Sequence, residues 1–275
     1  MKKSVLLLTL LLIFCCANAQ FYYNDVVDLK AANAMYANLV KNNVQEITAA
    51  SAESDNTPTT GFTYSKTLKN NGAIAETHTG LETGGVSSDY DTYTNGLIAK
   101  SQDVADSVST TVEYMYDNEG KILTVKTRTD DTTMDTHSTE LHQWFYTGSI
   151  PDSMLRIKNG GDTTSVHFKK DGNQNIVEEL WLKRGHMIEH YFYYYNDKNQ
   201  LTDIVRFNAR AKQMLPDYMF EYNDNGTLSQ LTQIPQGSSD YVIWQYEYDS
   251  RGLKTKDVLL DKHKGLLGTV SYTYR

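Results

Sequence analysis

A pattern of alternating aromatic residues followed by turn residues recurs along the second half of this chain. In its clearest copies, two aromatic residues lie two positions apart and are followed by Asp or Asn and, in most copies, by Gly. The last aromatic residue of successive copies is Tyr195, Tyr222, Tyr248 and Tyr274, a spacing of 26 or 27 residues. A regular period of this length is typical of repeat architectures, in which each copy is one supersecondary unit.

Each copy is expected to form a β-hairpin. Residues i and i+2 of an extended chain lie on the same face, so the paired rings form one stripe. Asp, Asn and Gly after the rings are the residues that tight turns favour. Aliphatic residues then open a second strand, as at Ile122, Ile176, Leu201 and Leu228. Weaker upstream copies contain Tyr64, Tyr93, Trp144 and Phe168.

These hairpins predict the fold class. Two strands per copy with short connections give an all-β, antiparallel β-hairpin meander, curled or barrel-like, of roughly 14 to 16 strands. We assign this repeat domain to residues 61–275.

The N-terminus has the features of a secretory signal peptide. Lys2 and Lys3 precede an apolar segment, residues 5–16, which is followed by the small-residue site that ends at Ala19. We expect residues 1–19 to be removed and the mature chain to be periplasmic or extracellular. No later stretch approaches the roughly 20 apolar residues that a transmembrane helix requires.

Both cysteines lie inside the predicted signal peptide. Acylation of Cys15 or Cys16 is the alternative to cleavage after Ala19, and the bulky Phe14 before Cys15 disfavours it. Cleavage would leave a chain without thiols, which excludes disulfides, zinc–thiolate sites and cysteine nucleophiles.

Residues 20–60 are expected to form an N-terminal helix and a linker. Apolar residues recur at steps of three and four between residues 24 and 50, and Asn24 or Asp25 can cap the start of this helix. A polar linker follows from Ser51 to Thr60. A helix with one apolar stripe must bury it, and the face of the sheet is the large partner available.

The charge balance limits the classes of partner. The chain has 26 Lys and Arg against 34 Asp and Glu, a formal net charge of −8. An acidic chain is a poor partner for nucleic acid and for anionic membrane surfaces.

The repeat resembles two kinds of protein. The segments from Tyr114 to Ile122 and from Tyr246 to Leu253 are similar to the tyrosine-aspartate (YD, or Rhs-type) repeat. They also resemble exported bacterial proteins of unknown function with a porin-like antiparallel sheet. The resemblance covers roughly residues 88–275. It implies an antiparallel β-sheet fold, and neither family supplies a catalytic residue to carry over.

The sharpest catalytic motif is His186-Met-Ile-Glu189-His190, the H-x-x-E-H pattern of some zinc proteases. It needs a helix to bring both imidazoles to one metal. The repeat instead predicts a strand, where residues four apart are about 13 Å from each other. A second set, His137, Glu140 and His142, is interpreted as polar residues before the Trp144 strand. We therefore predict no catalytic residues, no metal site and no cofactor.

The paired rings are the candidate ligand-binding residues. Flat aromatic faces can stack on sugars or hold a peptide, and the alternative is that they form the core of the sheet. We call the following eight residues the aromatic stripe: Trp144, Tyr193, Tyr195, Phe220, Tyr222, Trp244, Tyr246 and Tyr248.

The sequence favours a non-catalytic exported protein with a structural or binding role, whose partner is a glycan, a peptide or another protein. The alternatives are an outer-membrane β-barrel and a secreted hydrolase with an unrecognised site. Charges in the second strands oppose a lipid-facing outer surface. These charged residues are Lys126, Arg128, Glu178, Glu179, Asp203, Arg206, Lys254, Lys256 and Asp257.

Overall fold

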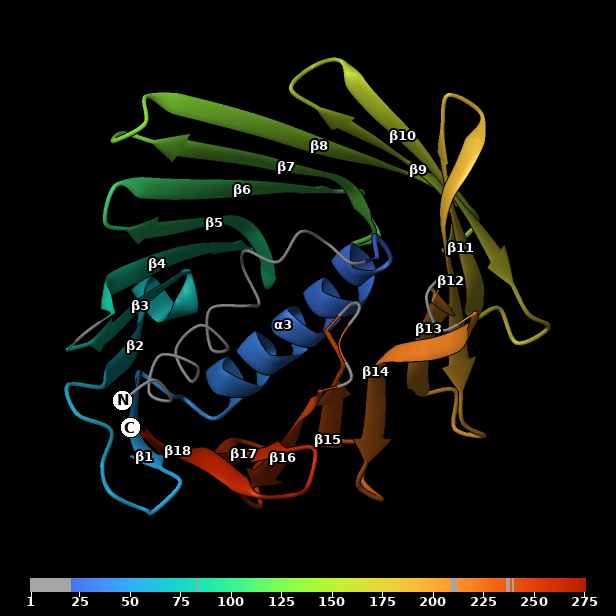
Figure 1. Ribbon diagram of the computed structural model, residues 1–275. Helices are drawn as coiled ribbons and strands as arrows, with labels where there is room; N and C mark the ends of the chain where they lie inside the picture. Colours follow the sequence, from blue (N-terminus) through green and yellow to red (C-terminus); the bar gives the residue numbers. More distant parts are fainter. Residues whose placement is uncertain (1–20, 83, 209–211, 236–237, 239) are drawn as a thin grey trace. The chain divides into compact units, whose positions relative to one another are not determined.

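The computed structural model describes residues 21–275 except 83, 209–211, 236–237 and 239. The predicted signal peptide therefore lies outside the described residues. The described chain contains helix α3 (Asn24–Lys41), a 3-10 turn η1 (Asn70–Gly72) and eighteen β-strands (Figure 1). The first nine strands are β1 (Glu46–Glu53), β2 (Thr63–Lys69), β3 (Ile74–Leu81), β4 (Gly85–Thr94), β5 (Leu97–Ala105), β6 (Val108–Tyr116), β7 (Ile122–Asp131), β8 (Thr136–Thr147) and β9 (Ile150–Lys158). The remaining strands are β10 (Asp162–Lys170), β11 (Ile176–Lys183), β12 (His186–Tyr195), β13 (Leu201–Asn208), β14 (Gln213–Tyr222), β15 (Leu228–Gln233), β16 (Val242–Tyr248), β17 (Lys254–Asp261) and β18 (Leu266–Tyr274).

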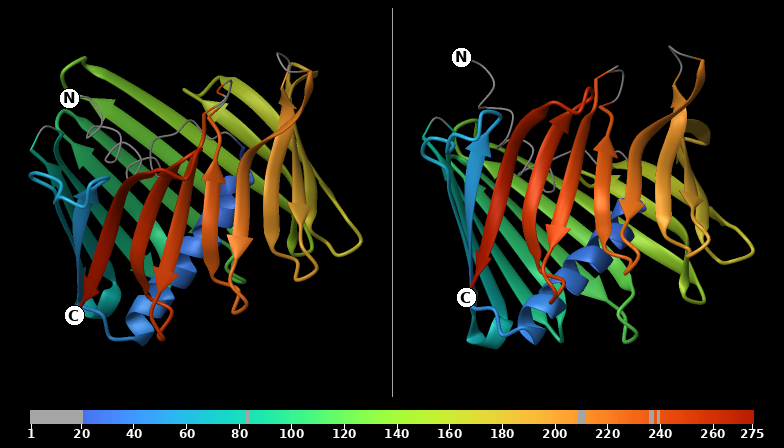
Figure 2. Two further views of the ribbon diagram at one scale, coloured as in Figure 1. Left: turned by 60° about the horizontal axis from the view of Figure 1, so that its bottom comes forward. Right: turned by 90° about the horizontal axis from the view of Figure 1, so that it is seen from below.

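The strands pair in the order of the chain. Each strand pairs with the strands before and after it, and β18 also pairs with β1, which is the order of pairing in a barrel. Short hairpins join successive strands (Figure 2). The predicted all-β antiparallel meander with one N-terminal helix is therefore confirmed, with more strands than predicted.

The chain divides into two compact units. Unit 1 comprises the described residues of Met1–Gln143 with Arg156–Asp162 and Val270–Arg275. Unit 2 comprises Trp144–Leu155 and Thr163–Thr269. Unit 1 contains α3 and the pairings from β1 to β8, and unit 2 contains the pairings from β10 to β17.

One turn geometry recurs in the hairpins. In the turn after β16, the carboxylate of Asp249 accepts hydrogen bonds from the backbone N–H groups of Arg251 and Leu253, at 2.9 and 3.0 Å. The backbone N–H of Asp249 also donates to the carbonyl of Leu253. The same backbone bond closes the turns that begin at Asp117, Asp171, Asn196, Asn223, Asp249 and Asp261. The Asp or Asn side chain thus accepts hydrogen bonds from backbone N–H groups that, because of the tight bend, cannot pair with the neighbouring strand.

A β-bulge precedes the turn in several of these hairpins. The register shifts immediately before Tyr116, Tyr195, Tyr222 and Tyr248, so that each of these residues pairs with the first residue of the following strand. Ile122, Ile176, Leu201 and Leu228 open β7, β11, β13 and β15, as the sequence predicts. The repeat visible in the sequence is therefore a repeat of bulge, turn and aliphatic strand start.

Helix α3 is shorter than predicted. It ends at Lys41, and residues 46–53 of the predicted helix and linker form strand β1. Asn43 has a positive φ of 53°, and the N–H of Val44 donates to the carbonyl of Leu39. This is the geometry that ends a helix at a left-handed residue. The helix was predicted too long because Ile47, which is buried in β1, lies at a spacing that also fits an apolar helix face.

The predicted cap of this helix is also wrong. Tyr23 occupies the N-cap position and makes no side-chain capping bond. Asn24 instead donates to the carboxylate of Asp28, and Asp25 contacts a histidine of β8. Within the described part of the chain, no helix has the length and apolar character needed to cross a membrane.

The helix packs on the sheet of unit 1, as predicted. The ring of Tyr36 stacks on Tyr93 of β4 with centroids 3.6 Å apart, and its hydroxyl donates to the carbonyl of Gly72 at 2.7 Å. The side-chain oxygen of Asn33 accepts the backbone N–H of Ile98 at the start of β5. Buried apolar residues of unit 1 include Phe21, Tyr22, Tyr36, Leu39, Val44, Ile47, Ala75, Ile98, Ile122, Val125 and Val270. Those of unit 2 include Trp144, Met154, Val166, Ile176, Tyr191, Tyr193, Leu201, Ile204, Leu231, Trp244, Leu253 and Leu259.

Candidate functional site

Members of the aromatic stripe share one face of the sheet in unit 2. Phe220 of β14 lies opposite Leu231 of β15, and Leu231 lies opposite Trp244 of β16. Directly opposite residues of antiparallel strands lie on the same face, so Phe220 and Trp244 belong to one row across three strands. Trp144 stacks on Phe168 with ring centroids 5.4 Å apart.

The stripe combines buried and partly exposed rings. Trp144, Tyr193 and Trp244 are buried. The half-buried members are Tyr195, Phe220, Tyr222, Tyr246 and Tyr248. Part of the stripe is thus core, and the remaining rings keep some surface for contact.

Tyr193 has a defined partner inside the sheet. Its hydroxyl donates a hydrogen bond to the carboxylate of Glu179, which is fully buried and also accepts from the indole N–H of Trp181 at 2.5 Å. Burial, together with the neighbouring Glu179, holds the pKa of Tyr193 well above its ordinary value. Tyr193 therefore remains neutral, donates a hydrogen bond to Glu179 and is part of the core.

The last tyrosine of a hairpin bonds to the preceding hairpin. The hydroxyl of Tyr195 donates to the carbonyl of Ile176 at 2.8 Å, and that of Tyr222 donates to the carbonyl of Leu201 at 2.7 Å. Ile176 and Leu201 are the residues that open the second strands of the preceding copies. These two stripe residues therefore join successive repeats through their hydroxyls.

Three charged residues do not lie where the sequence argument placed them. Glu179, Arg206 and Asp257 are buried, and each lies opposite a tyrosine of the ring-bearing face. Glu179 accepts a hydrogen bond from the hydroxyl of Tyr193 and Arg206 donates to that of Tyr191, whereas Asp257 accepts from the ammonium group of Lys254. Lys126 and Arg128 are exposed, each with 58% of the side chain accessible.

A shallow pocket adjoins the stripe at the turn between β12 and β13. It has a volume of about 410 Å³ and includes Phe220 and Tyr222 of the stripe. We call it the turn pocket. Its polar residues are Asn196, Asp197, Lys198, Gln200, Thr202, Glu221 and Asn223. It therefore brings two half-buried rings together with amide, carboxylate and ammonium groups.

The H-x-x-E-H residues lie on a strand. His186 opens β12, where it pairs with Lys183, and His190 pairs with Leu180. The imidazole of His190 contacts the carboxylate of Glu178 at 2.9 Å. Among the described residues, no group of three or more His, Cys, Asp or Glu residues is arranged to hold a metal ion.

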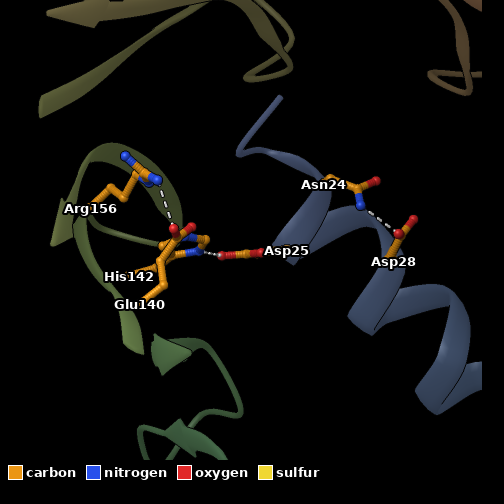
Figure 3. A network of polar contacts seen from close by, with 6 residues as sticks. All are labelled: Asn24, Asp25, Asp28, Glu140, His142 and Arg156. Carbon is orange, nitrogen blue, oxygen red and sulfur yellow. Dashed lines mark hydrogen bonds and ion pairs between the residues drawn. The ribbon is translucent and has the colours of Figure 1, made fainter. Parts of the chain in front are cut away.

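A polar cluster links α3 to β8 and β9 within unit 1 (Figure 3). His142 Nδ1 lies 2.6 Å from a carboxylate oxygen of Asp25, and His142 Nε2 lies 2.9 Å from Glu140. Arg156 donates to the other carboxylate oxygen of Glu140 at 2.7 Å. The prediction that Glu140 and His142 precede the Trp144 strand is wrong, because both lie within β8 as alternate residues beside Trp144. Asp25 was not predictable, because it is 117 positions away.

Protonation stabilises this cluster. Burial opposes the charged form of His142, but the carboxylates of Asp25 and Glu140 outweigh it and raise the pKa of His142 to about 9. Burial likewise disfavours the charged form of Glu140, yet hydrogen bonds from His142 and Arg156 lower its pKa to about 2. The cluster thus contains two cations and two anions in alternation, an arrangement that holds the helix in place.

Comparisons with known proteins give no family. No family model and no curated protein matches the chain. Among solved structures, a porin-like protein from Bacteroides uniformis matches 84% of this chain and 96% of its own, with 11% identity and a TM-score of 0.39. The TcdB2-TccC3-Cdc42 structure matches 78% of this chain with 10% identity and a TM-score of 0.30. The Photorhabdus luminescens Tc holotoxin pore does so with 9% identity and the same TM-score. This chain spans 15% and 16% of those two chains. TM-scores this low carry no argument about function.

Proposed function

We propose that this chain is an exported, non-catalytic binding protein that holds a glycan in the turn pocket. The observation that carries the proposal is the composition of this pocket, in which Phe220 and Tyr222 lie beside amide and carboxylate side chains. Sugars present apolar C–H faces that pack on aromatic rings and hydroxyl groups that hydrogen-bond to amides and carboxylates. A volume of about 410 Å³ suits one or two sugar rings.

Export is part of the proposal and is supported by the sequence of residues 1–19. The periplasm or the cell exterior is where an exported chain would meet polysaccharide. The tyrosine repeat, which resembles YD-type proteins, supplies the rigid scaffold in this proposal.

The exposed face of the sheet supports a binding role over an outer-membrane role. Lys100, Glu113 and Lys126 are successive partners across β5, β6 and β7, and all three are exposed. A row of charges on the face turned away from the helix is costly against lipid hydrocarbon.

Glycan binding can be tested with a matched pair of turn variants. Asp197 lines the turn pocket, whereas Asp224 occupies the equivalent position of the next turn and does not line it. A glycan array would identify a bound oligosaccharide, and calorimetry with that oligosaccharide would compare Asp197→Ala and Asp224→Ala. We expect Asp197→Ala to weaken binding about tenfold and Asp224→Ala to leave it unchanged, because a hydrogen bond to a charged group contributes about 1.5–3 kcal/mol. An array without any bound glycan, or equal losses in both variants, would reject the proposal.

A further inference from the structure

A second pocket lies at the opposite ends of the same strands. It is formed by the start of β12, the end of β13, the start of β14 and, after β15, by Ile234, Pro235 and Ser238, all within unit 2. Its volume is about 520 Å³. We call it the edge pocket. It is separate from the turn pocket, and the two share no lining residue.

The edge pocket combines apolar walls with polar residues, which are Glu189, His190, Arg206, Asn208, Asp217 and Ser238. The apolar walls include Met187, Ile188, Phe207, Leu215 and Ile234. Met187, Ile188 and Phe207 expose 61%, 50% and 55% of their surface, and all three line this one pocket. Aliphatic walls with a flexible methionine are typical of surfaces that accept apolar side chains of a partner.

The base of the edge pocket contains a buried ion pair with unused hydrogen-bonding capacity. Arg206 and Asp217 are 6% and 5% exposed, and Arg206 Nε lies 2.8 Å from Asp217 Oδ2. The angles of this contact do not make it a hydrogen bond. Arg206 Nη1 donates to the hydroxyl of Tyr191 at 3.3 Å. Among the described residues, the buried atoms Arg206 Nη2 and Asp217 Oδ2 have no hydrogen-bond partner.

This donor and acceptor define the ligand chemistry. Arg206 Nη2 can donate a hydrogen bond to a ligand acceptor, and Asp217 Oδ2 can accept one from a ligand donor. The charge of Arg206 is already balanced by Asp217 and by Glu189, which is 3.6 Å away, so an additional carboxylate would be repelled. A neutral group that both accepts and donates fits, and the peptide group is such a group. Buried polar atoms left without partners cost free energy, so their pairing favours binding.

We propose that the edge pocket binds one apolar residue of an extended peptide from a protein partner, with the side chain against the apolar walls and a peptide group at Arg206 and Asp217. The aliphatic residues Met187, Ile188 and Leu215 suit the apolar side chain of a peptide. This inference does not depend on the proposed glycan site.

The test uses N-acetyl-L-leucine N′-methylamide as the probe, titrated into the folded full-length mature chain and followed by NMR chemical shifts. We expect a Kd on the order of 1 mM, as ligand efficiency predicts for a molecule of this size. The matching methyl ester, which lacks the C-terminal N–H, is expected to bind about tenfold more weakly. Methyl glucoside is expected not to bind. Absence of methylamide binding, equal binding of the ester, or competition by methyl glucoside would each overturn the proposal.

Two variants locate the binding. Phe207→Ser removes a wall of the edge pocket, and Tyr194→Ser removes a ring of similar exposure on β12 that does not line it. Because both rings are about half exposed, both variants should fold, which circular dichroism can verify. We expect Phe207→Ser to weaken binding of the methylamide at least about tenfold and Tyr194→Ser to leave it unchanged. Equal effects of the two variants would overturn the proposal. Phe207→Ser is expected to leave glycan binding intact, so this site and the turn pocket can fail separately.

Discussion

At the scale of single residues, the fourth position of the recurring turn determines how easily each hairpin bends. This position has a positive φ in all six turns, with values from 56° to 86°. Gly fills it at Gly120, Gly226 and Gly252, and residues with a Cβ fill it at Gln174, Asn199 and Lys264. A side chain in the left-handed region costs free energy, so these three turns are weaker than the others.

Lys264→Gly should therefore stabilise the protein. Its φ of 62° is favourable for Gly and strained for Lys. We expect the free energy of unfolding to rise by about 0.5–1 kcal/mol, which is the relief of strain less the greater entropy of Gly in the unfolded chain. Urea denaturation would measure it. Lys264→Ala serves as the control and should show no gain, and stabilisation by Ala of the same size would contradict this interpretation.

At the scale of elements, contacts between hairpins decide how the repeats are joined. The hydroxyls of Tyr195 and Tyr222 reach the backbone of the preceding copy, whereas Tyr193 bonds to the buried Glu179. Helix α3 is joined to β8 by His142 and to β4 by the stacked rings of Tyr36 and Tyr93. Each link joins segments that are separate in the sequence, which explains why the repeat pattern alone did not reveal it.

Tyr222→Phe should destabilise the protein while keeping the ring. The variant removes the hydroxyl that donates to the carbonyl of Leu201 at 2.7 Å. We expect a loss of about 1 kcal/mol in the free energy of unfolding, the usual contribution of a neutral hydrogen bond. Phe220→Tyr, which alters a stripe residue of the same strand by adding a hydroxyl, is the reference variant. A loss below the error of the denaturation measurement would mean that this hydroxyl does not join the repeats.

The His142 cluster predicts a pH dependence of stability. The folded pKa of His142 is raised to about 9 against an ordinary value of about 6.5 in the unfolded chain. Its stabilisation is therefore complete below about pH 6.5 and is lost as the pH rises through 9, on the order of 2–3 kcal/mol. Burial also raises the pKa of Asp28 from 3.8 to about 6. That group lowers the stability as the pH rises between these two values, which lie below the pH range in which His142 loses its proton.

The measurement compares His142→Gln with the parent chain by urea denaturation between pH 6.5 and 9.5. We expect the difference in unfolding free energy to be largest at pH 6.5 and to shrink toward pH 9.5. His137→Gln, which alters an exposed histidine of the same strand, is the control and should follow the parent. A pH-independent difference for His142→Gln would exclude a charged His142 in the folded protein.

At the scale of the whole molecule, local patterns were predictable and long-range ones were not. Paired rings, Asx turns and aliphatic strand starts predicted the hairpins and the antiparallel order, since each hairpin forms from neighbouring residues. The end of α3 was also signalled locally, by Asn42 and Asn43, but the helical spacing of Ile47 concealed it. The Asp25–His142 contact instead depends on where α3 packs, because it joins residues 117 positions apart. No single-sequence pattern encodes that information.

The central claim is the register that places the paired rings on one face of successive strands, and cross-linking tests it most directly. In the chain from Gln20 onward there is no native cysteine. Gln230 and Gln245 are direct partners across β15 and β16, with side chains 3.1 Å apart. Direct partners lie about 4.5–5.5 Å apart at Cα, within the range a disulfide spans. Mass spectrometry of non-reduced peptides should find an intramolecular disulfide in Gln230→Cys/Gln245→Cys and none in Ser229→Cys/Gln245→Cys. The reverse result would mean that the true register is shifted by one residue. The rings would then lie on the opposite face, which contradicts the central claim.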